Sequence, residues 1–574
     1  MRPYRPMVTG TRHMIVAGHH AAAHAGFAVL EDGGNAIDAG VAAGIALSVL
    51  QTDRVNFAGV APIMIYHAKS RKVVSIDGLG VWPRAASIDV FIERHGGSML
   101  PGILNTVTPA APDAWITALE RYGTMRFADV ANAAIGFARD GFAMHWLMAE
   151  WIEENQEAYR RWPSNAEIFL PGGKPPRVGD LFVQRDLART LQYMVDEEAA
   201  QARNGRVAGL RAARDAFYVG DIAATIVDYH RTNGGWITTE DLAGYRVRFE
   251  PPVCTRFGTS FGDIDLFACG PWCQGPVLPQ ALNIVSAFDL RALGHNSPQY
   301  IHLLTEALKL AFADRHRYYG DPRFVDVPID TLMSMAYATE RRNAIDPQRA
   351  APGMPDAGAI AHSEPSATVL HATHGVVPPA VDTSFVCVVD REGNALSATP
   401  SDTSSSTPVI PGTGLCPSSR GTQSWCDPRL PAALAPGKRP RLTPSPAIAL
   451  RNGRAYMPFG TPGNDVQPQA MLQVFLNIHV FGMDVQSAVE APRFATYSFP
   501  GSSAPHAYYP GRLNLENRIP DATGQSLARL GHDVQWWGDR EWRAGGVCVT
   551  RVNPDTGILE GGADPRCPTY ALGW

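Results

Sequence analysis

The sequence contains few cysteines, and they are not spaced as a metal site or a disulfide framework would require. Eight cysteines are spread over 574 residues. There is no C-x-x-C pair and no cysteine–histidine cluster with zinc spacing. Cys269 and Cys273 are close in sequence, and chance explains their proximity best. We therefore expect neither a metal site nor structural disulfides, and a reducing compartment is the simplest prediction.

Long hydrophobic runs are also missing. Residues 1–18 contain no apolar stretch long enough for a signal peptide. The longest apolar run, at 39–50, is too short to cross a membrane and is rich in small residues. These features predict a cytoplasmic protein with no membrane partner.

Neither sign of charge is in large excess. The chain has 50 lysines and arginines against 55 aspartates and glutamates, a net charge of −5. This balance does not favour nucleic acid or an anionic membrane as a partner, so we expect a small molecule. With 45% hydrophobic residues the composition is that of a globular protein with a large core. The length allows three or four domains, or one large α/β domain with insertions.

Residue patterns predict several helical segments and a pair of short strands, at 63–66 and 73–76, before a linker. Residues 18–50 predict two helices around a glycine-containing turn, and residues 110–235 are helical in period. Residues 298–318 predict an amphipathic helix. Residues 350–380 are rich in Pro, Gly, Ala and Ser and lack periodicity, so we expect an exposed linker there.

The pattern changes after this linker. Residues 384–389 predict a strand, residues 390–394 a hairpin turn, and residues 395–399 the returning strand. The polar segments that follow, 404–408 and 416–425, are predicted to be solvated loops. A flexible segment therefore meets a rigid strand just before residue 384.

Thr383 stands at this junction. A threonine hydroxyl is a poor nucleophile unless a base takes its proton. If the preceding peptide bond is cut, the new α-amine, with a pKa of about 7.7–8.0, can be that base near neutral pH. The hydroxyl can make this cut itself by attacking the preceding carbonyl. On its own, however, a threonine at the start of a strand is more often structural.

Several sequence blocks occur in a fixed order around this junction. They include G-G-N-A-I-D-A (33–39), L-G-H-N-S-P-Q-Y-I-H-L-L-T-E-A-L-K-L-A-F-A-D-R (293–315), D-T-S-F-V-C-V-V-D-R-E-G-N-A-L-S (382–397) and F-G-T-P-G-N-D (459–465). Their order and spacing resemble the γ-glutamyltransferase family of N-terminal-nucleophile (Ntn) hydrolases. The resemblance is colinear from about residue 18 to the C-terminus.

This resemblance implies an α/β (α+β) fold of the Ntn-hydrolase type, a four-layer αββα sandwich. It also implies autocleavage into a large segment, 1–382, and a small segment, 383–574. Both would form one domain, because strands from each build a shared core. The product would be a heterodimer of the chain's own two segments, with or without further oligomerisation. No metal and no organic cofactor is implied.

The resemblance also implies roles for individual residues. Thr383 aligns with the nucleophile, and Ser401 with the hydroxyl residue that helps to activate it. Gly463 and Asn464 align with the backbone amides of the oxyanion hole, the donors that stabilise a tetrahedral intermediate. The family typically has a second glycine where this chain has Asn464. The backbone N–H survives that change.

Four positions expected to contact the substrate depart from the family's pattern. Leu79 stands where γ-glutamyl transferases have an arginine that binds the substrate α-carboxylate. Leu442 and Thr443 replace paired serines, and Thr403 lies where an asparagine contacts the amino-acid head group. An aliphatic side chain cannot make a bidentate contact with a carboxylate. The departures therefore predict an amide substrate that is not a γ-glutamyl compound.

The sequence thus predicts a self-processing amide hydrolase or acyltransferase that acts on a small-molecule amide. Three alternatives remain open. The chain could be a true γ-glutamyltransferase or glutathione hydrolase with a rearranged carboxylate site. It could be a β-lactam side-chain acylase or an oxamate-type amidohydrolase. Finally, it could be an uncleaved protein that binds a small molecule without catalysis.

Overall fold

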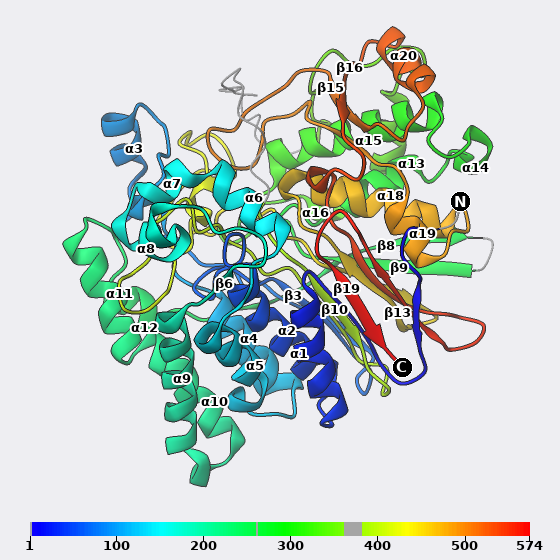
Figure 1. The fold of residues 1–574 in the computed structure, drawn as a ribbon. Coiled ribbons are helices and arrows are strands. Elements are labelled where there is room, and N and C mark those ends of the chain that lie inside the picture. Colours follow the sequence, from blue (N-terminus) through cyan, green and yellow to red (C-terminus); the bar gives the residue numbers. More distant parts are fainter. Residues whose placement is uncertain (1–2, 260–261, 361–381) are drawn as a thin grey trace.

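Two stacked seven-stranded sheets form the centre of the molecule, and helices cover the outer face of each (Figure 1). The structure is a computed structural model that describes residues 3–259, 262–360 and 382–574. Apolar clusters fill the space between the sheets and the space under each helical layer. The four-layer αββα sandwich implied by the resemblance is confirmed.

The first sheet has the order β1-β18-β17-β13-β12-β9-β8. All of these neighbours pair antiparallel. Its strands are β1 (Val8–Gly10), β8 (Val253–Thr259), β9 (Gly262–Ala268), β12 (Ala447–Arg451), β13 (Arg454–Gly460), β17 (Cys548–Val552) and β18 (Leu559–Ala563).

The second sheet has the order β19-β2-β10-β11-β3-β4-β7 and is also antiparallel. Strands from 1–382 and from 383–574 lie side by side in both sheets, so the two segments share one core. The strands of this sheet are β2 (Met14–Ala17), β3 (Ile63–His67), β4 (Lys72–Ile76), β7 (Phe249–Glu250), β10 (Val386–Val389), β11 (Ala395–Ala398) and β19 (Tyr570–Gly573).

The helices α1 (His20–Glu31) and α2 (Ala36–Leu50) cover the second sheet, as predicted for residues 18–50. A capping box starts α2: the Asn35 side chain accepts from the Asp38 amide, and the Asp38 carboxylate accepts from the Asn35 amide. Every residue of α2 is buried. Its glycines make this possible, since a Cβ at Gly44 would lie 2.5 Å from the Trp115 ring.

A group of helices from residues 88–243 packs around α1 and α2, and the prediction that residues 110–235 are mostly helical is confirmed (Figure 1). A two-stranded sheet of β5 (Phe142–Ala143) and β6 (Leu181–Phe182) lies within this group. The helices are α3 (Ile88–His95), α4 (Ala111–Tyr122), α5 (Phe127–Asp140), α6 (Trp146–Glu154), α7 (Gln156–Arg160), α8 (Pro163–Phe169), α9 (Arg185–Ala200), α10 (Arg206–Tyr218), α11 (Asp221–Thr232) and α12 (Thr239–Ala243).

The other helical layer lies on the first sheet. It consists of α13 (Val277–Val285), α18 (Gln467–His479) and α19 (Val485–Glu490), and α15 (Pro298–Tyr318) packs on α13. Near this layer lie α14 (Leu290–Leu293), α16 (Ile329–Leu332), α17 (Met335–Asn343), α20 (Asp521–Arg529) and a small sheet of β14 (Phe494–Thr496), β15 (Arg512–Glu516) and β16 (Asp533–Trp537).

The helix α15 has the predicted bounds but not the predicted environment. It is buried on nearly all sides rather than on one stripe. Its charged side chains are buried in pairs: Lys309 donates to Glu306 at 2.8 Å, and Arg315 pairs with Asp465. Charge pairing therefore allows a helix with a polar face to lie inside the protein.

The hairpin predicted at 384–399 is present as β10 and β11. The predicted linker at 350–380 falls largely outside the described residues, and its described part, 350–360, has no regular secondary structure. None of the helices in the described ranges combines the length and apolarity needed to cross a membrane.

Candidate active site

Thr383 lies at the start of the buried hairpin, three residues before β10. Its side chain is fully buried, and its amide nitrogen donates to the carbonyl oxygen of Arg54 at 3.1 Å. The backbone φ angle of Thr383 is +96°. A β-branched residue is strained in this region, at a cost of about 1–3 kcal/mol. The tertiary structure therefore holds Thr383 in a conformation that it would not adopt alone.

The Thr383 hydroxyl is one member of a closed ring of four polar side chains. Thr383 Oγ1 lies 2.6 Å from Ser401 Oγ and donates to Asp382 Oδ1 at 3.1 Å. Arg420 Nη2 closes the ring, because it donates to Asp382 Oδ2 and to Ser401 Oγ, each at 2.6 Å. Since all four residues are buried, each of these contacts is stronger than it would be in water.

The hairpin and the loop before it bring the two hydroxyls together. Ser401 follows β11, and its amide donates to the Val60 carbonyl at 2.9 Å. The Arg54 carbonyl accepts from Thr383 and also from Asp402, each at 3.1 Å. The Arg54 carbonyl oxygen thus links Thr383, which precedes β10, to Asp402, which follows Ser401. The pair Thr383 and Ser401 predicted from the sequence is in contact.

Arg420 is a residue that the sequence reasoning missed. It lies in the 3₁₀ helix η4 (Arg420–Gln423), within a segment predicted to be a solvated loop. That prediction is wrong, because 404–408 and 416–425 are mostly buried. Their polar groups are satisfied internally: for example, Asp402 accepts from the hydroxyls of Ser418 and Ser419 at 2.5 and 2.6 Å. Pattern alone does not distinguish such a buried polar loop from a solvated one.

The electrostatic balance keeps Arg420 charged. Burial lowers its pKa, but the carboxylates of Asp382 and Asp402 outweigh burial and raise the pKa overall. Burial also raises the pKa of Asp402, although Arg420 and its serine partners oppose this. The Arg420 guanidinium lies 3.6 Å from Asp402 and 2.6 Å from Asp382. It therefore links the carboxylate before Thr383 to the carboxylate after Ser401.

The predicted oxyanion loop connects β13 to the helix α18. Gly463 and Asn464 both have positive φ angles, +131° and +52°. Asparagine tolerates this left-handed region better than most residues, which explains how it can stand where the family has glycine. Gln274 holds the loop, since its side-chain nitrogen donates to the Asn464 carbonyl at 2.7 Å and to the Thr443 carbonyl at 2.9 Å. The oxyanion role of these amides stays a prediction.

The predicted substrate-contacting residues fall into two environments. Leu79 and Leu442 are fully buried in the same apolar cluster between the sheets, beside Trp272. Thr443 is in a polar environment, where its hydroxyl accepts from Gln423 at 2.8 Å. The structure thus brings the two leucines together as core residues, and a substrate contact for either stays a prediction.

Thr403 lies in the loop after Ser401. It is half-buried, and its hydroxyl contacts Ser405 at 2.8 Å. Its neighbour Asp402 is held by Asn56, whose side chain donates to the Asp402 carbonyl at 2.8 Å. This part of the loop is therefore anchored to the segment that follows α2. The role predicted for Thr403 in substrate binding stays a prediction.

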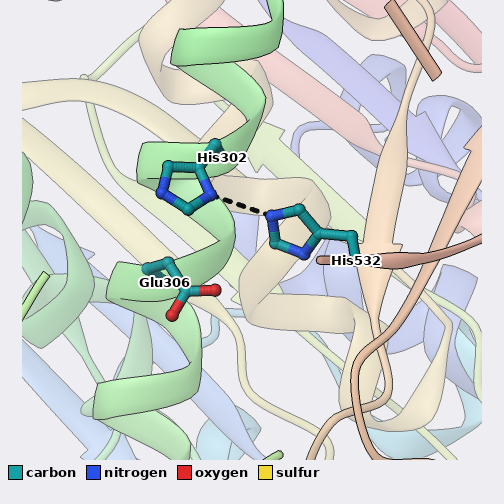
Figure 2. Close-up of side chains that lie close together, drawn as sticks. All are labelled: His302, Glu306 and His532. Carbon is teal, nitrogen blue, oxygen red and sulfur yellow. Dashed lines mark hydrogen bonds between the residues drawn. The ribbon is translucent and has the colours of Figure 1, made fainter. Parts of the chain in front are cut away.

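Three buried side chains elsewhere carry atoms that could hold a metal ion: His302 and Glu306 of α15, and His532. Figure 2 shows the two imidazoles turned toward each other, with a distance of 2.9 Å between His302 Nδ1 and His532 Nε2. Lys309 donates to Glu306 at 2.8 Å and neutralises it. Burial lowers the pKa of His532 to about 3, so its ring is neutral. Both ring nitrogens of His302 have partners, because its Nε2 lies 2.8 Å from the Asp346 carbonyl, whereas His532 Nδ1 has none among the described residues. With Glu306 paired to Lys309, we assign the group a structural role.

Known proteins resemble this chain over its whole length. The sequence model of the family described as Gamma-glutamyltranspeptidase matches residues 22–574. The Acylase ACY 1 proenzyme of Pseudomonas sp. (strain SE83) is 34% identical over 97% of this chain and 92% of the relative. The Glutathione hydrolase-like YwrD proenzyme of Bacillus subtilis (strain 168) is 30% identical over 99% of both. The Oxamate amidohydrolase proenzyme of Klebsiella pneumoniae is 30% identical over 98% of this chain and 99% of the relative.

Solved structures of similar fold also match this chain over its whole length. The structure of LmbA2991HD is 35% identical, has a TM-score of 0.91 and covers all of both chains. The cephalosporin acylase from Bacillus halodurans is 28% identical, with a TM-score of 0.85 over 100% of this chain and 98% of that one. With a family match from residue 22 to the last residue and this shared fold, the chain belongs to the gamma-glutamyltranspeptidase family and is an Ntn-type enzyme of its amidohydrolase and acyltransferase class.

Proposed function

We propose that this protein cuts its own chain before Thr383 and then hydrolyses a small-molecule amide with Thr383 as the nucleophile. The observation that carries the proposal is the 2.6 Å contact between the buried hydroxyls of Thr383 and Ser401. A structural threonine at the start of a strand needs neither a strained backbone nor a ring of buried polar partners. The word proenzyme in the names of the acylase, hydrolase and oxamate relatives supports the cleavage.

In the mature enzyme, the α-amine of Thr383 acts as the base for its own hydroxyl. The nitrogen of Thr383 is already held in place by its hydrogen bond to the Arg54 carbonyl, at 3.1 Å. Thr383 Oγ1 attacks the substrate carbonyl, and the amides of Gly463 and Asn464 stabilise the oxyanion. The amine product leaves, and water resolves the acyl-enzyme. Hydrolysis is the expected outcome, and transfer to an amine acceptor is the related reaction of the same intermediate.

We propose an acyl group other than γ-glutamyl. At position 79 the chain has a leucine, which is packed against Leu442 and Trp272 in an apolar cluster. The leucine side chain itself offers no hydrogen bond to a substrate α-carboxylate, and a buried carboxylate without a partner is costly. The names of the acylase and oxamate relatives support this choice, whereas the name of the YwrD relative supports the glutathione-hydrolase alternative.

Intact mass spectrometry and N-terminal sequencing of the purified protein, beside a Thr383→Ala variant, test the cleavage. The parent should give two pieces of about 41 and 21 kDa, in proportion to their shares of the chain, with Thr383 as the new N-terminus. The variant should stay at full mass. A parent chain that stays uncut would remove the free α-amine and favour the binding-protein alternative.

A panel of chromogenic anilides then tests the acyl group. We expect turnover of at least one simple acyl or oxalyl anilide and none of γ-glutamyl-anilide. Thr383→Ala serves as the blank for spontaneous hydrolysis. Efficient turnover of γ-glutamyl-anilide alone would favour the true γ-glutamyltransferase alternative.

A further inference from the structure

We propose that the carboxylate of Asp382 is the base that takes the proton from the Thr383 hydroxyl when the chain cuts itself, and that Arg420 positions this carboxylate. The inference rests on the proposed function, in which Thr383 is the nucleophile. Asp382 is then a second catalytic group in self-cleavage, and it is also the residue whose own peptide bond to Thr383 is cut.

The uncut chain needs a base that differs from that of the mature enzyme. Before cleavage the nitrogen of Thr383 is an amide, and it donates to the Arg54 carbonyl at 3.1 Å. An amide nitrogen in this role cannot take a proton. The α-amine that serves the mature enzyme is therefore created by the very reaction that requires a base.

Asp382 is the carboxylate in contact with the nucleophile. Thr383 Oγ1 lies 3.1 Å from Asp382 Oδ1 and 2.6 Å from Ser401 Oγ. Of these two partners, the serine hydroxyl is not basic near neutral pH, whereas a carboxylate is ionised there. The carboxylate of Asp402 has other partners, because it accepts hydrogen bonds from Ser418 and Ser419.

The donors in the ring can all point in one direction. Arg420 has no acceptor atoms, so it must donate to Ser401 Oγ. Ser401 is then free to donate its own hydrogen to Thr383 Oγ1, and Thr383 donates to Asp382 Oδ1. In this arrangement the Thr383 proton is directed at the Asp382 carboxylate. The Ser401 hydroxyl donates to Oγ1 and stabilises the negative charge that develops there.

Arg420 divides the two oxygens of Asp382 between two tasks. It donates to Oδ2 at 2.6 Å, while Oδ1 stays directed at the hydroxyl. The Asp382 side chain is only 10% exposed, and that of Arg420 3%. Water therefore competes little for either group, and the carboxylate is held before the reaction starts. Arg420 acts through Asp382 and Ser401, so it is a positioning residue.

The reaction balances with one water and no other reactant. Asp382 takes the proton from Thr383, and Oγ1 forms a bond to the carbonyl carbon of Asp382. The carbon–nitrogen bond then breaks, and the nitrogen of Thr383 receives the proton from the carboxyl group. Water hydrolyses the resulting ester, which restores the hydroxyl and leaves Asp382 as the new C-terminus of the large segment.

Backbone strain favours the same step. The φ angle of +96° at Thr383 is imposed while its nitrogen is part of the peptide bond to Asp382. When that bond breaks, the constraint on this angle ends. The strain stored in the uncut chain is then released. The backbone strain and the carboxylate base thus both favour cleavage of the peptide bond between Asp382 and Thr383.

The test measures cleavage rates in pulse-labelled cell-free translation, where the uncut chain can be followed on a gel. Asp382→Asn keeps the shape of the side chain and removes its basicity. We expect it to slow cleavage by about 100-fold or more, the usual contribution of a general base. Asp382→Glu should recover part of the rate, and Asp555→Asn, which changes an exposed carboxylate in a distant hairpin, should cleave at the parental rate.

The pH dependence separates a base from a merely structural residue. The self-cleavage rate of the parent should fall at low pH, where a carboxylate base takes up a proton. The rate of the Asp382→Asn variant should not show this fall. Arg420 is the cation within the ring; the charged groups beside it are Asp402 and Arg54, and Arg54 pairs with Asp53 and also interacts with Asp382. If the cleavage rate of the slow Asp382→Asn variant still falls at low pH, another group is the base and the inference is wrong.

Two outcomes separate this inference from the proposed function. If Asp382→Asn cleaves at the parental rate while Thr383→Ala stays uncut, only the role of Asp382 fails. If Thr383→Ala is cut at the same bond, the nucleophile itself is wrong and the proposed function fails with it. Circular dichroism and thermal melting of each uncut chain show whether a slow variant is folded.

Discussion

The hydroxyl of Thr383 lies 2.6 Å from that of Ser401, although 18 residues separate them in the chain. The hairpin of β10 and β11 accounts for this proximity, because Thr383 and Ser401 flank its open end. Both hydroxyls are fully buried. A contact of this kind, between a strained threonine and a serine that accepts from an arginine, is the centre of the candidate site.

Replacement of Ser401 tests this contact. Ser401→Ala should lower both the self-cleavage rate and the turnover of the best substrate by about tenfold to a hundredfold, since a buried hydrogen bond to the reacting oxygen is lost. Ser401→Thr keeps the hydroxyl and should retain most of the rate. Steady-state kinetics and the cleavage assay measure the two effects. Equal activity of the alanine and threonine variants would show that the hydroxyl plays no part.

Arg420 should be important for stability as well as for chemistry. Arg420→Met leaves Asp382 and Asp402 without their shared cation, and breaking a buried ion pair in this way costs about 3–5 kcal/mol. Urea denaturation of the uncut Thr383→Ala background gives the free energy of unfolding without interference from cleavage. Arg391→Met, in an exposed pair with Glu392, is the control and should change nothing measurable. Equal stability of the two variants would contradict the buried network.

Leu79 should behave as a core residue. Leu79→Ala opens a cavity beside Leu442 and Trp272 and should lower the free energy of unfolding by about 2–5 kcal/mol. Leu100→Ala, at a leucine that is 59% exposed, is the matched control and should have little effect. Chemical denaturation measures both. If Leu79→Ala leaves stability unchanged but raises KM, the side chain faces the substrate rather than the core.

The helix α2 depends on small residues. Gly44→Ala should destabilise the fold, because the new Cβ would lie 2.5 Å from the Trp115 ring, which other packed groups hold in place. Gly136→Ala in α5 is the control: nothing lies within 4 Å of its Cβ, and alanine favours a helix by about 0.5–1 kcal/mol. Thermal melting of the two variants should shift in opposite directions. A Gly44→Ala variant that melts at or above the parental temperature would show that the close packing of α2 is unimportant.

Local sequence predicted the elements that local chemistry controls. The two helices around residues 32–35 follow from apolar segments on either side of a glycine turn, and the hairpin at 384–399 follows from two apolar segments around the turn D-R-E-G-N. The environment of α15 could not be predicted in the same way. Its charged residues indicate a solvated face, but their partners, such as Asp465, lie far away in the sequence.

The candidate site divides in the same manner. Thr383 and Ser401 could be named because the resemblance to a known family places them, and Thr383 also stands at a visible change of pattern. Arg420 could not be named from the sequence, because it lies in a segment of small and polar residues, a composition typical of solvent-exposed loops. Only the fold shows that this segment is buried and that its guanidinium meets Asp382 and Ser401.

The sequence by itself determined the family, the order of the elements and the junction at Thr383, since these depend on residue types and on their spacing along the chain. The tertiary structure alone decided which groups touch the nucleophile and which leucines belong to the core. The physical reason is distance along the chain. Arg420 and Asp382, which are hydrogen-bonded, lie 38 positions apart, and Leu79 and Leu442, which share an apolar cluster, lie several hundred positions apart. Whether such groups are paired or packed depends on the burial that the two stacked sheets create.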